Sequence, residues 1–439
     1  MRRPRPPAIT LALTLVALVA APAAEAKRGP CIPGQKKPKC RVWTGKVMAV
    51  ADGDTINARI RTGGGLSRRT DIRLLGIQAM ELTDYSRSRG RRGACHAVEA
   101  AERLEFLLQG RRVKRRTIRI ASRRAGSVTQ GARARLRRAV AFRSGGRWHD
   151  AGAVLMGEGH GLWDPNGKEW AWNKRYAKLA QRAARDAREL WDPDACRPGP
   201  SQASILELKV KWDAPGQDGK NVNGEWVRIR NTDPVNDVPL RGWWLRDAFL
   251  RRYTFPRGAV VPAGGSIRLR MGRGRSGGDT YYWGQRDAVF ENVKGGRRAI
   301  GDGAYLFDPD GDLRAWVMYP CRVACSEPLR GRVRIQARRR APESIRVTNT
   351  SDAPIDLFEY EVESVPWFYE FGTSALLPPG ESIVLNVRGN PGRDTRFEKN
   401  WGFDRYLLGD KKDVVTLRNP LGAPVTCHAW GRGTRCPGV

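Results

Sequence analysis

The stretch VMAVADGDTINARIRTGGGLSRRTDIRLLGIQAME, residues 47–81, decides how the first part of the chain folds. Two β-rich runs flank the turn Asp52-Gly53-Asp54-Thr55, as the two strands of a hairpin do. A third β-rich run carries Arg73, and Glu81 follows it. An acid, a cation and a second acid in this order are the groups that a metal-assisted attack on a phosphodiester needs.

Working outward from this stretch, period-two and helical patterns alternate over the first half of the chain. The expected strands are 42–50, 55–61, 71–77, 113–120, 138–142 and 147–149, and the expected helices are 97–109, 154–161 and 168–190. The order is three strands, a helix, the loosely alternating run 113–120, a hairpin formed by 138–142 and 147–149, and further helices. Strands in this order, with helices inserted and appended, fit a small closed barrel such as the OB-fold.

The chain begins like a secretory signal peptide. Arg2, Arg3 and Arg5 precede an apolar run at 8–20, and Ala24-Glu25-Ala26 fits a small-x-small cleavage site. A membrane anchor needs about 20 apolar residues, and this run is shorter. We therefore expect an exported, soluble protein without a transmembrane segment in the mature chain, with an uncleaved N-terminal anchor as the alternative.

The cysteines agree with an oxidising compartment, because an even number in an exported chain predicts disulfides. Proximity in the sequence favours Cys31–Cys40 and Cys427–Cys436, and Cys321–Cys325 with a long-range Cys95–Cys196 would use the remaining four. Other connectivities stay open, since the eight cysteines allow about 105 pairings.

The formal net charge of +34 predicts contact with polyanions such as nucleic acid, acidic cell-wall polymers or anionic lipid. Charge alone supplies non-specific attraction and supports no chemistry. Alternatively, the high net charge keeps the protein soluble or reflects an arginine-rich proteome.

A proline-rich polar segment at 192–202 separates this half from a second one, in which aromatic and β-branched runs alternate with turn residues. Such a pattern is typical of antiparallel β-sandwiches. The second half also repeats itself: 227–232, VRIRNT, matches 345–350, IRVTNT, and 261–267 matches 377–383. The expected divisions are a signal peptide at 1–26, a linker with a local disulfide at 27–40, a first domain at 41–196, a linker at 197–204, and sandwiches at 205–325 and 326–439.

An ordered set of motifs in the first half resembles the staphylococcal-nuclease (thermonuclease) family over about 41–191. The motifs are Asp52-Gly-Asp-Thr55, Arg73-Leu-Leu-Gly-Ile77, Glu81, Arg138-Ala-Val-Ala-Phe142, Leu155-Met-Gly-Glu-Gly159 and Leu190-Trp191. The resemblance implies a five-stranded OB-fold barrel with helices. It also implies Ca²⁺-dependent hydrolysis of DNA or RNA with little sequence specificity, because phosphate contacts do not read bases.

The resemblance implies a metal centre at Asp54, Gln78 and the backbone carbonyl of Ala79, since Ca²⁺ prefers oxygen ligands. Asp54 has the plainer interpretation of a turn residue.

The same resemblance makes Arg73 and Arg138 phosphate ligands and Glu81 the general base, because guanidinium binds two phosphate oxygens and a carboxylate can accept a proton from water. The two arginines could instead be surface cations, and Glu81 could have no catalytic role.

This chain departs from the family pattern beside Glu81. Gln78 stands where the family has a metal-binding aspartate, which removes a charge on which Ca²⁺ affinity depends. Met80 replaces a proline, and Leu136-Arg137 replaces a Tyr-Gly pair. Two functions therefore stay open: a secreted Ca²⁺-dependent nuclease, or a catalytically impaired basic module that binds nucleic acid or other polyanions at the cell surface.

The two β repeats resemble lamin tail domains, which are immunoglobulin-like sandwiches. The first is the clearer match, through Gly224-Glu-Trp-Val-Arg-Ile-Arg-Asn-Thr232 and Gly303-Ala-Tyr-Leu-Phe-Asp-Pro-Asp-Gly-Asp312. The resemblance implies binding or targeting rather than catalysis, toward a partner that the sequence does not identify. We expect an extracellular protein, associated with the cell wall if the sandwiches bind there.

Overall fold

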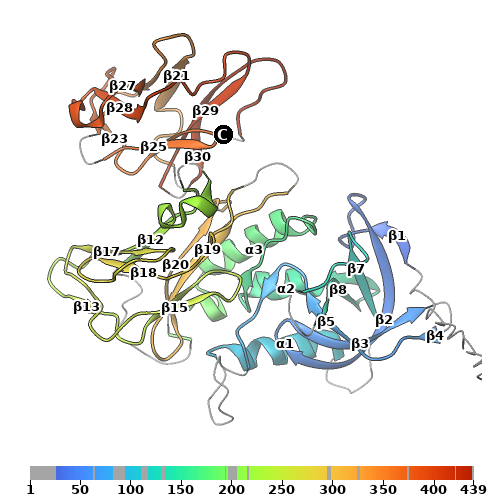
Figure 1. Cartoon of the computed structure of the whole chain (residues 1–439). Coiled ribbons are helices and arrows are strands. Elements are labelled where there is room, and N and C mark those ends of the chain that lie inside the picture. Colours follow the sequence, from blue (N-terminus) through green and yellow to red (C-terminus); the bar gives the residue numbers. More distant parts are fainter. Residues whose placement is uncertain are drawn as a thin grey trace, which may run out of the picture.

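The computed structural model describes residues 26–62, 65–82, 94–109, 117–129, 134–192, 194–195, 205–214, 217–293, 298–323, 327–372, 375–420 and 422–437. The described chain is mostly β-structure, in several sheets, with few helices. A first part contains all the α-helices, and two β-sandwiches follow it (Figure 1). The expected signal peptide lies outside the described residues, except for Ala26. No helix among the described residues is long and apolar enough to cross a membrane.

The first part is built around one eight-stranded sheet with the order β1-β2-β7-β8-β5-β3-β4, in which β9 also pairs with β8. Strand β2 pairs with β3 as well as with β7, so the pairings among β2, β7, β8, β5 and β3 return to β2. The strands are β1 (Lys27–Pro30), β2 (Lys39–Asp52), β3 (Thr55–Thr62), β4 (Gly65–Leu66), β5 (Thr70–Leu74), β7 (Thr117–Ser122), β8 (Leu136–Ser144) and β9 (Arg147–Asp150). Two short strands, β6 (Ile77–Gln78) and β10 (Leu162–Trp163), pair with each other.

The segment expected as a linker at 27–40 contributes to this sheet instead. Strand β1 pairs with the start of β2 in antiparallel register, from Lys27 opposite Val42 to Pro30 opposite Lys39. The Cys31–Cys40 disulfide closes the turn between the two strands, as proximity in the sequence predicts. Both cysteines are buried, so this segment belongs to the core of the first part.

Helix α1 (Ala97–Gln109) has the bounds that its apolar spacing predicts. Helix α2 (Ala151–Glu158) begins and ends three residues before the expected 154–161. The Asp150 carboxylate accepts the Ala153 N–H at its start, and Gly159 at φ 99° ends it. The expected helix at 168–190 is split into α3 (Asn173–Arg185) and the 3-10 turn η1 (Glu189–Trp191).

Tertiary contacts explain the shorter third helix. The Glu169 carboxylate accepts the backbone N–H groups of Arg123 at 2.6 Å and Arg124 at 3.0 Å, which holds its segment in a loop of bends and turns. At the other end, Ala187 and Glu189 have φ values of 48° and 50°, which no α-helix allows.

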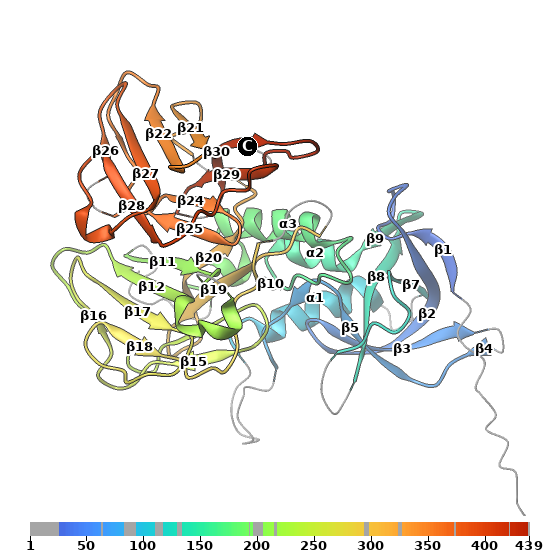
Figure 2. The same ribbon diagram turned by 45° about the horizontal axis from the view of Figure 1, so that its top comes forward.

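The three helices lie between the strands of the first part and the first sandwich in both views (Figures 1 and 2). One hydrophobic core contains side chains from both units, including Trp191 of the first part and Trp244 of the sandwich. The Trp191 ring lies 6.0 Å from the Tyr305 ring and 5.4 Å from the Trp316 ring. Gln181 on α3 adds a polar contact, because its Nε2 donates to the Pro320 carbonyl at 3.0 Å.

The two sandwiches have the same sheet topology, strand for strand. The first has sheets β11-β12-β17-β18, β13-β16 and β15-β14-β19-β20, and the second has β21-β22-β27-β28, β23-β26 and β25-β24-β29-β30. The first contains β11 (Leu206–Lys211), β12 (Trp226–Asn231), β13 (Val238–Pro239), β14 (Trp244–Arg246), β15 (Arg252–Thr254), β16 (Val260–Val261), β17 (Ser266–Arg270), β18 (Thr280–Tyr282), β19 (Asp302–Phe307) and β20 (Leu313–Tyr319). The second contains β21 (Val333–Arg338), β22 (Ser344–Asn349), β23 (Ile355–Asp356), β24 (Glu361–Ser364), β25 (Trp367–Glu370), β26 (Leu376–Leu377), β27 (Ser382–Arg388), β28 (Glu398–Phe403), β29 (Asp413–Arg418) and β30 (Pro424–Trp430).

Buried polar residues repeat together with the topology. Asn231 ends β12 and donates to the carbonyls of Asn236 at 2.7 Å and Val261 at 3.4 Å. Asn349 ends β22 and donates to the carbonyls of Ala353 at 2.8 Å and Leu377 at 3.0 Å. The sequence repeat at these asparagines is therefore also a repeat of the side-chain hydrogen bonds.

The sandwiches keep separate hydrophobic cores and meet through charged groups and through the Trp212 ring, which packs against Gly422. Lys209 lies 3.2 Å from the Glu370 carboxylate, and Lys211 lies 2.7 Å from the Glu361 carboxylate. Lys211 also lies 3.3 Å from the centre of the Phe368 ring.

The remaining cysteines agree with an oxidised chain. Cys427–Cys436 forms as expected. Cys95 and Cys321 are also disulfide-bonded. Their expected partners, Cys196 and Cys325, lie outside the described residues.

Candidate functional site

Asp54 lies in the turn between β2 and β3 with only 4% of its surface exposed. Hydrogen bonds on both sides fix this turn. The Asp54 N–H donates to the Asp52 carboxylate at 3.0 Å, and the Thr55 hydroxyl donates to Asp54 Oδ1 at 3.0 Å. The carboxylate is therefore held in one orientation beneath the surface, which an ordinary solvated turn residue does not require.

Arg73 meets this carboxylate from the neighbouring strand, because β5 pairs with β3 and puts Arg73 opposite Thr55. Its Nη1 lies 2.5 Å from Asp54 Oδ1, and both side chains are buried. The other carboxylate oxygen, Oδ2, accepts the Ala79 N–H at 2.8 Å. The turn at 52–55 and the segment that follows β5 are thus joined through one buried acid.

Gln78 links the remaining predicted groups to this pair. Its Oε1 accepts a hydrogen bond from Arg73 Nη2. Its Nε2 donates to the Ala79 carbonyl at 3.1 Å and to Glu81 Oε1 at 2.9 Å. Five predicted site residues, Asp54, Arg73, Gln78, Ala79 and Glu81, therefore form one continuous hydrogen-bonded cluster.

Burial dominates the electrostatics of this cluster. It raises the pKa of the Asp54 carboxyl from 3.8 to about 7, and the nearby charges of Asp52 and Glu81 act in the same direction. The Arg73 guanidinium and the Ala79 N–H act in the opposite direction without cancelling the effect of burial. The positive charge of Arg73 alone therefore does not offset the cost of burying a charged Asp54 carboxylate.

Arg138 is not part of the cluster. Its guanidinium donates to the backbone carbonyls of Ala125 at 2.5 Å, Ser127 at 2.7 Å and Arg137 at 2.8 Å. It also lies over the Trp43 ring, 5.0 Å from the ring centre. Burial lowers the pKa of Arg138 to about 10. These contacts give Arg138 a structural role in holding the 125–127 turn.

Its neighbour Arg137, rather than Arg138, lies opposite Arg73 in the sheet. Strands β5 and β8 run parallel, with Arg73 opposite Arg137 and Leu74 opposite Arg138. Side chains at paired positions share a face of the sheet, so Arg137 lies on the same face as Arg73. The Arg137 side chain is 21% exposed, and its Nη2 lies 3.5 Å from the Asp164 carboxylate.

A further cation, Arg135, reaches the turn itself, since its Nη1 donates to the Thr55 hydroxyl at 2.9 Å. Sequence reasoning missed both Arg135 and Arg137. The period-two alternation along β8 puts Arg137 and Arg138 on opposite faces, and Arg135 immediately precedes the strand. Which face points to Asp54 depends on the pairing with β5, and that pairing is not visible in the sequence.

The donor chemistry of the cluster fits a hard cation, because carboxylate, amide and carbonyl oxygens converge there. The same oxygens are engaged by other donors: Arg73 contacts Asp54 and Gln78, and the Gln78 amide contacts Ala79 and Glu81. Ca²⁺ would therefore fit by oxygen type, but it would have to displace the amide and the guanidinium.

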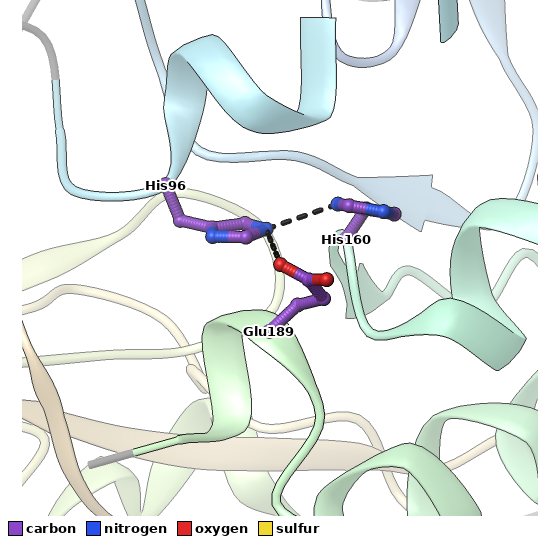
Figure 3. Close-up of side chains that lie close together, drawn as sticks. All are labelled: His96, His160 and Glu189. Atoms are coloured by element: carbon purple, nitrogen blue, oxygen red, sulfur yellow. Dashed lines mark hydrogen bonds and ion pairs between the residues drawn. The ribbon is translucent and has the colours of Figure 1, made fainter. Parts of the chain in front are cut away.

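A second group of potential ligands lies at the ends of three helical segments (Figure 3). His96 precedes α1, His160 follows α2, and Glu189 begins η1. The His96 Nε2 lies 3.0 Å from His160 Nδ1 and 3.9 Å from a Glu189 carboxylate oxygen. Burial lowers the pKa of both histidines, which favours neutral rings.

Sequence reasoning did not single out this second group. The three residues are far apart in the chain and have none of the short spacings that indicate a metal site. Only the packing of the three helical segments brings them together.

Comparison with known families identifies one part of the chain. Residues 205–321 match the family model of the Lamin Tail Domain. The match covers the first sandwich and does not extend to the first part or to the second sandwich. A comparison with curated proteins gave no match for this chain.

Proposed function

We propose that residues 41–196 form a staphylococcal-nuclease-like domain, an OB-fold barrel with helices, and that the chain is an exported Ca²⁺-dependent nuclease. It would hydrolyse DNA or RNA phosphodiesters with little sequence preference. The closed circuit of pairings among β2, β7, β8, β5 and β3 supports the barrel, because an OB-fold has five strands that close on themselves.

The single observation that carries the activity is the convergence of Asp54, Arg73 and Glu81 on Gln78 and Ala79. Residues of these types are common singly. A buried acid, a buried guanidinium and a second acid in one hydrogen-bonded cluster match what phosphodiester hydrolysis requires.

The roles follow from the chemistry of each group. Arg73 and Arg137 would bind the phosphate oxygens, since they share a face of the sheet and stay charged at working pH. Arg137 thus takes the role that the family resemblance gave to Arg138. Glu81 would accept a proton from the attacking water.

Ca²⁺ would be held by Asp54, Gln78 and the Ala79 carbonyl, and when bound it would supply positive charge as a Lewis acid.

The lamin tail domain at 205–321 would serve binding or targeting. We propose that the second sandwich is a further lamin tail domain, because it repeats the strand order of the first and the hydrogen bonds of its buried asparagine. Neither sandwich has a proposed catalytic role.

A second function is favoured by the hydrogen bonds of Gln78. Its amide occupies both the Ala79 carbonyl and the Glu81 carboxylate, which are the groups that hydrolysis needs. With these groups engaged, the first domain would be a basic module that binds nucleic acid or another polyanion without cleaving it. The net charge of +34 serves either function.

Hydrolysis of single-stranded DNA by the purified chain, with Ca²⁺ and with chelator, separates the two functions. The nuclease proposal expects cleavage that requires Ca²⁺ and that Glu81→Gln abolishes. Glu105→Gln is the matched control, because Glu105 is exposed on α1. The nuclease proposal would be wrong if cleavage in chelator equalled cleavage in Ca²⁺, or if Glu81→Gln cleaved DNA as fast as Glu105→Gln.

The binding proposal has its own measurement. The logarithm of the association constant for single-stranded DNA should fall linearly with the logarithm of the salt concentration, because each neutralised phosphate releases counterions. An affinity that is independent of salt would contradict it.

A further inference from the structure

Three metal-ligand side chains meet where α1, α2 and η1 come together. The imidazoles of His96 and His160 and the carboxylate of Glu189 each present one ligand atom, and these atoms lie within 4.8 Å of one another. Figure 3 shows the two rings and the carboxylate pointing to a common centre from three separate segments. Both histidines are buried, and Glu189 is at the surface.

We propose that His96, His160 and Glu189 bind one divalent transition-metal ion, with Zn²⁺ as the best fit. Two imidazoles and one carboxylate are the ligands that a zinc site uses when one position stays open. Zn–N bonds of about 2.0–2.1 Å in a tetrahedral site put neighbouring ligand atoms about 3.3 Å apart. The 3.0 Å and 3.9 Å separations from His96 Nε2 bracket that value, and the separation between His160 and Glu189, at most 4.8 Å, would have to shorten when the exposed Glu189 side chain moves onto the ion.

A hydrogen bond between the two imidazoles explains only part of this geometry. It accounts for the 3.0 Å contact between His96 and His160. It does not account for Glu189, whose carboxylate lies 3.9 Å from the same nitrogen, beyond hydrogen-bond distance. A cation between the three ligand atoms would satisfy all of them.

The surroundings contain the support that metal-binding histidines have. The other ring nitrogen of His160 lies 3.8 Å from the Glu158 carboxylate. Arg103 in turn holds Glu158 through two hydrogen bonds of 2.7 Å and 2.6 Å. At 3.8 Å the Glu158 carboxylate makes no hydrogen bond to the ring, so it would act on a metal-bound His160 through its negative charge.

An ion could reach this site from solvent. A pocket of about 720 Å³ is lined by His160, Glu189 and Glu158, with Glu99 and Glu102 at its side. Its four carboxylates outnumber the two guanidinium groups of Arg103 and Arg188, so the pocket would still attract a cation, and its open side would leave a coordination position for water.

Two of the three ligands have left-handed backbone conformations, with φ 66° at His96 and φ 50° at Glu189. Residues other than glycine adopt this region only when their surroundings hold them there, and such positions concentrate at functional sites. Here the following residues fix the backbone, since Trp191 packs on Tyr305 and Trp316 of the lamin tail domain. The ion would join η1 to both helices at the interface between the domains.

The test is Zn²⁺ binding by the purified, oxidised chain after treatment with chelator, in competition with a chromophoric chelator. The wild-type chain should bind one Zn²⁺ at this site. His160→Ala should weaken that binding by more than about 10–100-fold, which is the loss typical of removing a residue that only supports a ligand, and Glu158→Gln should weaken it by less than His160→Ala does. His149→Ala is the matched control, because His149 is exposed and its ring stacks on Phe142 and lies near the Ser144 carbonyl, in a hairpin that contributes no ligand to this site.

A second variant covers the case in which His160→Ala fails to fold. The Glu189 side chain is 50% exposed, so Glu189→Gln should fold, and it should lose the increase in melting temperature that Zn²⁺ gives the wild-type chain. No Zn²⁺ binding by the wild-type chain, or the same affinity in His160→Ala and His149→Ala, would overturn the proposal. Neither readout depends on nuclease activity, so the metal site and the proposed function fail or succeed separately.

Discussion

Replacing Gln78 with aspartate is the sharpest perturbation of the Asp54 cluster. The change removes the amide that donates to the Ala79 carbonyl at 3.1 Å and to Glu81 at 2.9 Å, and it adds a carboxylate beside a buried acid. Both effects favour a bound cation. A gain of about 10–100-fold in Ca²⁺ affinity is expected, which corresponds to about 1.4–2.7 kcal/mol.

The same substitution should have the opposite effect without Ca²⁺. Arg73 would then face two buried carboxylates, and the lost hydrogen bonds would lower the free energy of unfolding by about 1–3 kcal/mol. Ca²⁺ at 100 times its dissociation constant would return about 2.7 kcal/mol. Gln78→Asp should therefore be less stable than the wild-type chain in chelator and about equally stable in Ca²⁺.

The assays are calorimetric titration with Ca²⁺ and denaturant unfolding with Ca²⁺ and with chelator. Gln78→Ala is the matched control, because it removes the same hydrogen bonds without adding charge. If Gln78→Asp bound Ca²⁺ no more tightly than Gln78→Ala, the charge of position 78 would not limit metal binding, and the assignment of the metal centre would be refuted.

Three further predictions concern the charge of Asp54, the two arginines of β8 and the repeated asparagines. Because burial raises the pKa of Asp54 from 3.8 to about 7, Ca²⁺ must displace a proton below pH 7; titrations across pH should show affinity falling about tenfold per pH unit there. The same shift should lower the unfolding free energy as pH rises between these two values, and Asp54→Asn should remove that dependence. Arg137→Ala should weaken binding of single-stranded DNA and reduce its salt slope by about 0.7, with a small loss of stability from its contact with the buried Asp164. Arg138→Ala should instead lower the unfolding free energy by about 1–3 kcal/mol, since three backbone carbonyls lose their donor. Asn231→Ala and Asn349→Ala should each cost about 1–3 kcal/mol in denaturant unfolding, and a loss at only one of them would contradict the equivalence of the two sandwiches.

Local sequence patterns were sufficient to predict elements whose structure depends on residues close together in the chain. Helix α1 has the bounds that its apolar spacing predicts, and the hairpin of β2 and β3 forms around the Asp52–Thr55 turn. The repeat of VRIRNT as IRVTNT corresponds to two units with the same strand order. In each case the residues that decide the structure lie within a few positions of one another.

Where the structure differs from the prediction, contacts between distant parts of the chain are the reason. The expected helix at 168–190 is shortened because Glu169 is bound to a loop that lies more than forty residues earlier in the chain. Arg137 and Arg138 are equivalent by composition, and only the register with β5 determines which one accompanies Arg73. The group of His96, His160 and Glu189 gives no sequence signal at all, because its members meet only through packing.

The hydrophobic core that the first domain shares with the lamin tail domain has a consequence for cooperativity. These two units cannot separate without exposing Trp191, Trp244 and Tyr305 to water, so they should melt together as one calorimetric unit. The second sandwich has its own core and meets its neighbour through ion pairs such as Lys211–Glu361. Its melting should therefore be separable. We therefore expect two calorimetric transitions from a chain whose sequence predicts three domains.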